Sequence, residues 1–110
     1  MTVVYLSGKM TGLEKSEYEK RFNRAEDFYT SCGFTVINPC RIAEEVEKEN
    51  PKASYEDYMK ADLKALSGCT HIAMLDGWEG SNGAKREKAE AERIGIEIMF
   101  FREIGGLKQC

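Results

Sequence analysis

The segment from Asp76 to Glu87 constrains the fold most, because it joins a strand pattern to a helix pattern through a glycine-rich loop. It follows the apolar run 71–75 and holds three glycines and an asparagine within residues 77–83. Such a composition favours tight turns and close backbone approach. Open α/β sheets build their ligand crevice from this order of strand, loop and helix, and free N–H groups at a helix start suit an anion such as phosphate. The segment therefore predicts a ligand crevice.

The remaining chain repeats the alternation of strand and helix patterns. A length of 110 residues fits one domain, residues 1–110. We predict a single-domain, Rossmann/flavodoxin-like three-layer α/β fold, with a parallel sheet of four to five strands and helices on both faces. The expected strands are 2–7, 34–37, 70–75 and 96–101, the expected helices are 14–32, 41–49, 54–67 and 83–94, and an irregular tail surrounds Gly105 and Gly106.

Composition narrows the classes of partner. The net charge is −3, with basic and acidic residues interspersed, which argues against polymeric nucleic acid but not against a mononucleotide. No apolar run is long enough to span a bilayer and no signal-peptide pattern opens the chain, so we expect no membrane partner and a cytoplasmic location. The four cysteines lack C-x-x-C spacing and there is one histidine, so no metal site is expected.

Two carboxylates fall on helix faces that should pack against the sheet. Glu87 shares the stripe of Ala84, Ala91 and Ile94, where an unpaired charge is costly. The alternative is a glutamate at the stripe edge, paired with a neighbouring lysine. Asp62 lies in the stripe of the expected helix 54–67, among tyrosines and leucines, where a structural hydrogen-bonding role is the alternative. Paired carboxylates with different roles can break glycosidic bonds, although spacing alone does not identify the bond.

The loop after the first strand, residues 7–12, contains two glycines, two hydroxyls and one lysine. It matches neither the Walker A pattern nor G-x-G-x-x-G. A phosphate or sugar cradle and a plain strand-to-helix turn both remain open.

Four motifs, in this order, resemble the nucleoside 2-deoxyribosyltransferase-like superfamily. They are Tyr5–Gly12, Asn38-Pro39, Tyr58–Leu63 with Leu66, and Trp78–Glu87. The chain is most similar to small uncharacterised phage and bacterial members, and it also resembles nucleoside 5′-monophosphate N-glycosidases. The resemblance implies a nucleotide or nucleoside as the small-molecule substrate, no cofactor, and a homodimer or larger homo-oligomer.

The resemblance also implies roles for individual residues. Glu87 would be the nucleophile that forms a glycosyl ester at C1′, Asp62 would hydrogen-bond or protonate the departing base, and Tyr5 would orient Glu87. Gly8 would let the backbone approach the substrate. Ser81 stands where the monophosphate hydrolases hold phosphate with a serine. The substrate-binding candidates are Ser7, Gly8, Lys9, Met10, Thr11, Trp78, Ser81 and Gly83.

Some positions depart from the superfamily pattern. Lys9 and Thr11 stand where the monophosphate hydrolases have serine and arginine, and Lys9 can act only as a point charge for phosphate. A neighbouring subunit often completes the pocket with C-terminal residues, and the sequence identifies no such contributor. Trp78 could stack on a base, or equally cover the pocket or a dimer contact.

The sequence therefore predicts an enzyme that cleaves or transfers the N-glycosidic bond of a nucleoside 5′-monophosphate or (deoxy)nucleoside through a glycosyl-Glu87 intermediate. The alternative from another class is a non-catalytic module that binds or senses a nucleotide on the same fold. A flavodoxin-like phosphate binder using residues 7–12 is a third possibility.

Overall fold

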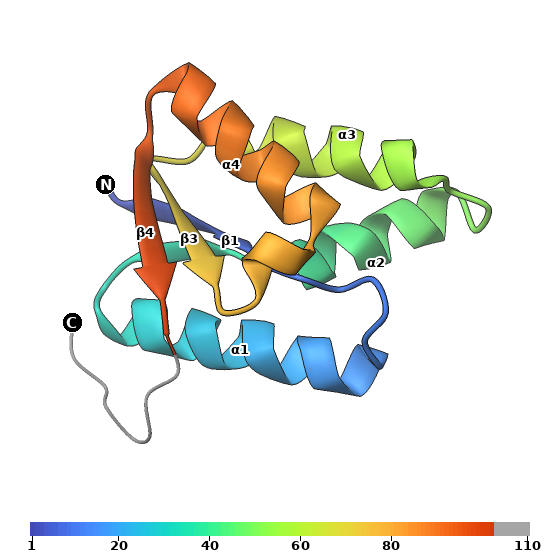
Figure 1. The fold of residues 1–110 in the computed structure, drawn as a ribbon, viewed down its shortest axis with the longest axis horizontal. Helices are drawn as coiled ribbons and strands as arrows, with labels where there is room; N and C mark the ends of the chain where they lie inside the picture. Colours follow the sequence, from blue (N-terminus) through green and yellow to red (C-terminus); the bar gives the residue numbers. More distant parts are fainter. Residues whose placement is uncertain (103–110) are drawn as a thin grey trace.

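The chain forms a three-layer α/β sandwich in a computed structural model that describes residues 1–102 (Figure 1). Strands and helices alternate along it, with two consecutive helices between the second and third strands and a short 3₁₀ turn after the third strand. In order they are β1 (Val3–Ser7), α1 (Lys15–Ser31), β2 (Thr35–Ile37), α2 (Pro39–Glu49), α3 (Tyr55–Leu66), β3 (His71–Leu75), η1 (Trp78–Gly80), α4 (Asn82–Ile94) and β4 (Glu97–Phe101).

The sheet has the strand order β2-β1-β3-β4, and every pair of neighbouring strands is parallel. The fold prediction is thereby confirmed, with four strands among residues 1–102. Because the strands are parallel, the loops that follow β1, β2 and β3 all leave from the same edge of the sheet. The expected irregular tail at residues 105–106 lies outside the described residues.

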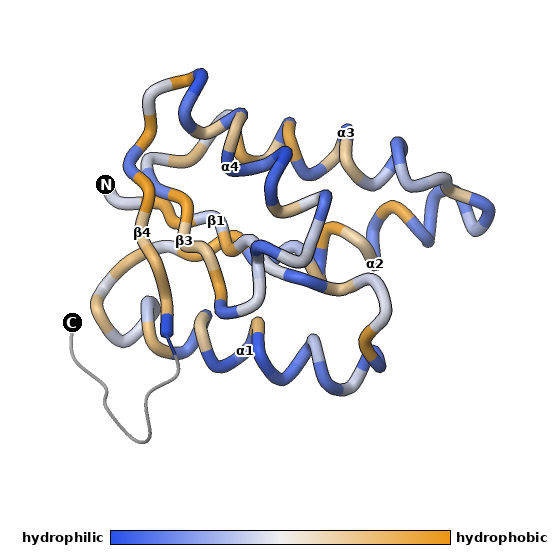
Figure 2. The backbone as a smooth tube through the Cα atoms, in the orientation of Figure 1, coloured by the Kyte–Doolittle hydropathy of each residue, from blue (hydrophilic) through white to orange (hydrophobic). Residues whose placement is uncertain are grey.

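Alternation along β1 divides the core between the two faces of the sheet. Val4 and Leu6 belong to the cluster that packs with α1, whereas Tyr5 belongs to the cluster formed with α3 and α4. Figure 1 shows α1 on one side of the sheet and the other helices opposite. In Figure 2 apolar residues concentrate along the strands, between these layers. Since side chains two apart in a strand share a face, Tyr5 and Ser7 both face the layer that contains α4.

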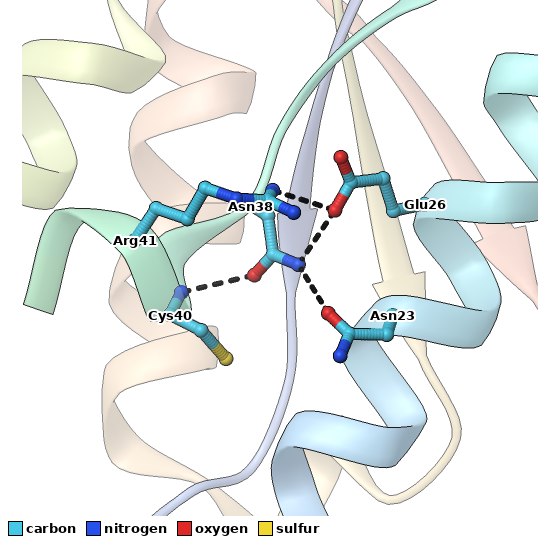
Figure 3. A network of polar contacts seen from close by, with 5 residues as sticks. All are labelled: Asn23, Glu26, Asn38, Cys40 and Arg41. Carbon is cyan, nitrogen blue, oxygen red and sulfur yellow. Dashed lines mark hydrogen bonds and ion pairs between the residues drawn. The ribbon is translucent and has the colours of Figure 1, made fainter. Parts of the chain in front are cut away.

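Helix α2 begins at Pro39, two residues earlier than predicted, because Asn38 caps it. The Asn38 side chain accepts a hydrogen bond from the backbone N–H of Cys40 at 3.0 Å, and Pro39 occupies the first helical position. Figure 3 shows the buried Asn38 amide donating to Asn23 at 3.2 Å and to Glu26 at 3.0 Å. This network ties the end of β2 and the start of α2 to α1.

Side-chain caps also fix the starts of the two helices that carry the predicted carboxylates. Ser54 and Asp57 form a capping box at α3, and Ser81 caps α4 by accepting from the N–H of Ala84 at 3.1 Å. Within residues 1–102, no helix combines the length and the apolar composition needed to cross a membrane.

Candidate active site

A cavity of about 820 Å³ opens at the carboxyl ends of the strands, where the loops and helix starts converge. Its floor holds both predicted carboxylates, Glu87 of α4 and Asp62 of α3. Six of the eight substrate-binding candidates line it, namely Gly8, Lys9, Met10, Thr11, Ser81 and Gly83. Ser7 and Tyr5 lie behind Glu87, and Trp78 lies elsewhere.

Glu87 is a buried carboxylate, 5% exposed, held by two hydroxyl groups from β1. Tyr5 donates its phenolic hydrogen to one oxygen at 2.6 Å, and Ser7 donates to the other at 2.6 Å. Burial raises the pKa of Glu87, whereas these donors and Asp62 act in the opposite direction. No ion pair within residues 1–102 joins Glu87 to Lys85 or Lys88, and the Lys88 ammonium lies over the Trp78 ring and near Glu92.

Asp62 is hydrogen-bonded to Glu87 from the adjacent helix. Burial, and next the negative charge of Glu87, raise the pKa of Asp62 from 3.8 to about 8. Tyr5 and Ser7 can each donate only one hydrogen, and both hydrogens go to Glu87. Tyr5, Ser7 and Asp62 therefore all donate to Glu87, and three donors suit an ionised carboxylate. The proton between the two carboxyl groups then belongs to Asp62. Near neutral pH the pair therefore offers one carboxylate and one carboxylic acid at the same point of the cavity.

The phenol of Tyr5 is fully buried and stays protonated. Its pKa is well above the ordinary value, because of burial first and the charge of Glu87 second. Tyr5 can therefore orient Glu87 but cannot serve as a base. The hydrogen bond from Tyr5 to Glu87 is the contact that the orienting role would need. Ser7 makes a matching bond to the other Glu87 oxygen and does not line the cavity.

The start of α4 forms the cationic side of the cavity. Ser81 accepts the Ala84 N–H and keeps its own hydroxyl hydrogen for another acceptor. The Lys9 ammonium lies against Gly80, where an added Cβ would come within 3.8 Å of its nitrogen. First-turn N–H groups of a helix are unpaired within the helix and favour anions. Lysine, hydroxyl and helix start thus converge on one place.

The glycines of the site serve packing as well as the cavity. A Cβ at Gly8 would meet Leu75 at 3.1 Å and Phe22 at 3.3 Å, so the absence of a side chain there permits the core to close. At Gly83 a Cβ would meet Met59 and Tyr55 at 3.4 Å. Core packing therefore gives one reason for the glycine at position 8, and substrate approach at the cavity stays a prediction.

Trp78 is absent from the cavity lining and packs on the opposite flank of α4. Its ring lies 6.2 Å from that of Phe100 on β4, and the Lys88 ammonium is 5.5 Å from its centre. The structure thus places Trp78 apart from the other candidates.

The cavity also contains residues that the sequence did not single out. Glu47 of α2 and Tyr58 of α3 form one part of its wall, and Arg86 stands over the ring of Tyr55 at another part, paired with Glu56 at 2.8 Å. A signal existed for Tyr58, which precedes Asp62 by one helical turn. None existed for Glu47, because its place depends on how α2 packs beside α3.

Two solved structures of other proteins have the same fold as this chain. A 2-deoxyribosyltransferase from Bacillus psychrosaccharolyticus superposes with a TM-score of 0.71 at 21% identity, over 98% of this chain and 77% of that one. The CMP N-glycosidase BcmB of Clostridium botulinum superposes with a TM-score of 0.59 at 20% identity, over 96% of this chain and 72% of that one. No curated protein matches the chain.

A family model matches residues 2–100, almost the whole described chain. Together with the two structural neighbours, this match confirms the resemblance that the motifs indicated. The chain belongs to the family described as a domain of unknown function (DUF4406).

Proposed function

We propose that this protein cleaves or transfers the N-glycosidic bond of a nucleoside 5′-monophosphate or nucleoside. The observation that carries the proposal is the pair of carboxyl groups in the cavity, in which buried Glu87 accepts three hydrogen bonds and half-buried Asp62 holds a proton with a pKa of about 8. N-glycosidic cleavage needs these two groups, a nucleophile for C1′ and an acid for the departing base.

In the first step an ionised oxygen of Glu87 bonds to C1′ while the bond between C1′ and the base nitrogen breaks. The electron pair of that bond stays on the base, which takes the proton of Asp62. In the second step water or another base attacks C1′, gives its proton to the Asp62 carboxylate and releases Glu87. Tyr5 and Ser7 hold the two Glu87 oxygens throughout, so the carboxylate is oriented before substrate binds.

One observation supports a nucleotide rather than a free nucleoside, and the structural neighbours support the type of bond. The cationic side of the cavity, with Lys9, Ser81 and the start of α4, suits a 5′-phosphate next to the catalytic pair. One of the structural neighbours is named as a CMP N-glycosidase, and the other as a 2-deoxyribosyltransferase. Both names are consistent with chemistry at a glycosidic bond.

The test is base release, measured by liquid chromatography from a panel of nucleosides and 5′-monophosphates. Glu87→Gln should abolish release, because an amide is a far poorer nucleophile, and Glu92→Gln on the exposed face of α4 is the matched control. Release should also decline as the pH rises through about 8, where Asp62 loses its proton. Wild-type rates in Glu87→Gln would refute the mechanism.

The same samples separate the enzyme from a binding module. Calorimetry followed by chromatography would show a module as tight binding with the nucleotide intact after long incubation. Light scattering tests the expected homodimer, for which the half-exposed Phe100 beside Trp78, on the outer strand β4, offers a contact.

A further inference from the structure

We infer that Glu47 and Tyr58 read the base, and that they select substrates whose base carries an exocyclic amino group, such as cytosine or adenine, over their oxo counterparts. The inference rests on the proposed function, because it places a base in the cavity. It adds a specificity-determining pair outside the catalytic pair, made of Glu47, which no motif contains, and Tyr58, to which the resemblance assigned no role.

The two side chains form one hydrogen-bonded unit on the cavity wall. Tyr58 of α3 donates its phenolic hydrogen to Oε1 of Glu47 on α2 at 3.3 Å, and both residues line the cavity. A phenol has a single hydrogen to donate. With that hydrogen used, the Tyr58 oxygen and the second oxygen of Glu47 offer only lone pairs to a ligand. This section of wall is therefore a hydrogen-bond acceptor with a negative charge.

No cation of the described chain neutralises that acceptor. The ion pairs among residues 1–102 include Glu45 with Lys48 on the same helix and Glu26 with Arg41 nearby, but none that includes Glu47. The charge of Glu47 is therefore available to a ligand that brings N–H groups.

The position of the unit relative to Asp62 fits the far edge of a base. Tyr58 and Asp62 lie one turn apart on α3, about 6 Å along the helix axis, and on the same face. Asp62 is the proposed proton donor to the departing nitrogen, so the opposite edge of the base extends toward Tyr58 and Glu47. The cavity is also lined by the apolar residues Pro39, Ala43 and Met59. Such surfaces suit the faces of a planar ring.

An acceptor at this position distinguishes amino from oxo bases by charge. The exocyclic amine of cytosine or adenine donates an N–H to the Glu47 carboxylate. Uracil and hypoxanthine carry a carbonyl oxygen at the same ring position, and that oxygen is repelled by the carboxylate. Since Glu47 is exposed, water competes for it, and a discrimination of roughly tenfold is expected rather than the much larger values of fully buried sites.

The experiment compares two matched pairs of substrates, CMP with UMP and AMP with IMP, each differing only in the amino or oxo group. The wild-type protein should favour the amino member of each pair by roughly tenfold in kcat/KM. In Glu47→Gln the ratio should approach one, because the amide can donate to a carbonyl as well as accept from an amine. Tyr58→Phe should reduce the ratio partly, since Glu47 loses its donor. The control is Glu44→Gln, an exposed glutamate on the same helix outside the cavity lining.

The outcomes separate this inference from the proposed function. Base release that depends on Glu87, with a wild-type ratio near one or a ratio unchanged in Glu47→Gln, overturns the inference and leaves the enzyme proposal standing. If no nucleotide is cleaved, the dissociation constants of the same four nucleotides for wild type and Glu47→Gln provide the ratio directly. Tighter binding of the amino members that disappears in the variant supports the inference, and equal affinities overturn it.

Discussion

Replacing Asp62 by asparagine should stabilise the protein at neutral pH. The folded chain holds the Asp62 proton with a pKa of about 8, whereas an unfolded aspartate releases it near the ordinary value of 3.8. Because the folded pKa lies above the unfolded one, the stability present at low pH is lost progressively as the pH rises from about 4 toward 8. Asparagine carries no proton to lose and can still donate an N–H to Glu87. The Asp62→Asn variant therefore does not lose stability in this way as the pH rises.

The size of the effect follows from the two pKa values. Their difference of about 4, at 1.36 kcal/mol for each pKa unit, gives a ceiling of about 6 kcal/mol at pH 8 and above. At pH 7 the same reasoning gives about 4 kcal/mol. Asp62 is half-buried and water screens part of its interaction with Glu87, so we expect about half of this. Asp62→Asn should then exceed wild type by about 2 kcal/mol in unfolding free energy at pH 7.

Urea unfolding at pH 5, 6, 7 and 8 measures this difference. The gap between Asp62→Asn and wild type should widen with each step in pH. Asp27→Asn, which removes the same charge from an exposed position on α1, is the matched control. A gap for Asp62→Asn that stays constant across the series would show that Asp62 is ionised in the folded protein, and the shared-proton account of the site would be wrong.

Three further changes test the support around the site. Tyr5→Phe removes a 2.6 Å bond to Glu87 worth roughly 1.5–3 kcal/mol, so base release should fall about tenfold or more at pH 6 and recover in part at higher pH. Asn38→Ala deletes a helix cap and two part-buried side-chain hydrogen bonds, and it should lower the unfolding free energy by about 1–3 kcal/mol in urea. Gly8→Ala forces a Cβ to within 3.1 Å of the core and should cost about 1–3 kcal/mol in thermal unfolding. Gly68→Ala, whose Cβ meets nothing closer than 3.7 Å, should cost less.

The elements were predictable because local patterns and tertiary packing agree along most of the chain. The buried strands are short apolar runs, and the stripe of α4 places Ala84, Glu87 and Ala91 inward as its period requires. The same period brought Glu87 and Asp62 to one crevice. Both carboxylates were therefore accessible to reasoning from sequence, although their roles came from a resemblance and remain a proposal.

The details that sequence reasoning missed depend on how separate elements meet. Asn38 ends β2 and also caps α2, because the chain turns directly from one into the other. Gly8 lines the cavity, and its missing side chain also makes room for Leu75 and Phe22, a packing role that no local pattern indicates. The two-residue period of a strand puts Ser7 on the same face as Tyr5. Its contact with Glu87 could not be predicted, because it depends on how α4 packs against β1. The position of Trp78 beside Phe100 was not predictable, because it depends on the direction of the preceding turn, which no local pattern indicates.

The cost of the carboxylate pair is itself an argument about function. Two adjacent carboxyl groups, one buried and one half-buried, could be replaced by apolar residues of similar size, often with a gain in stability. Three donors are nevertheless arranged around Glu87, which would not be needed if the pair only filled space. Protein sites that lower stability in this way commonly serve activity. If Asp62→Asn proves more stable than wild type and also loses base release, the instability and the chemistry have the same source. A stable variant with full release would instead leave Asp62 without a part in the reaction.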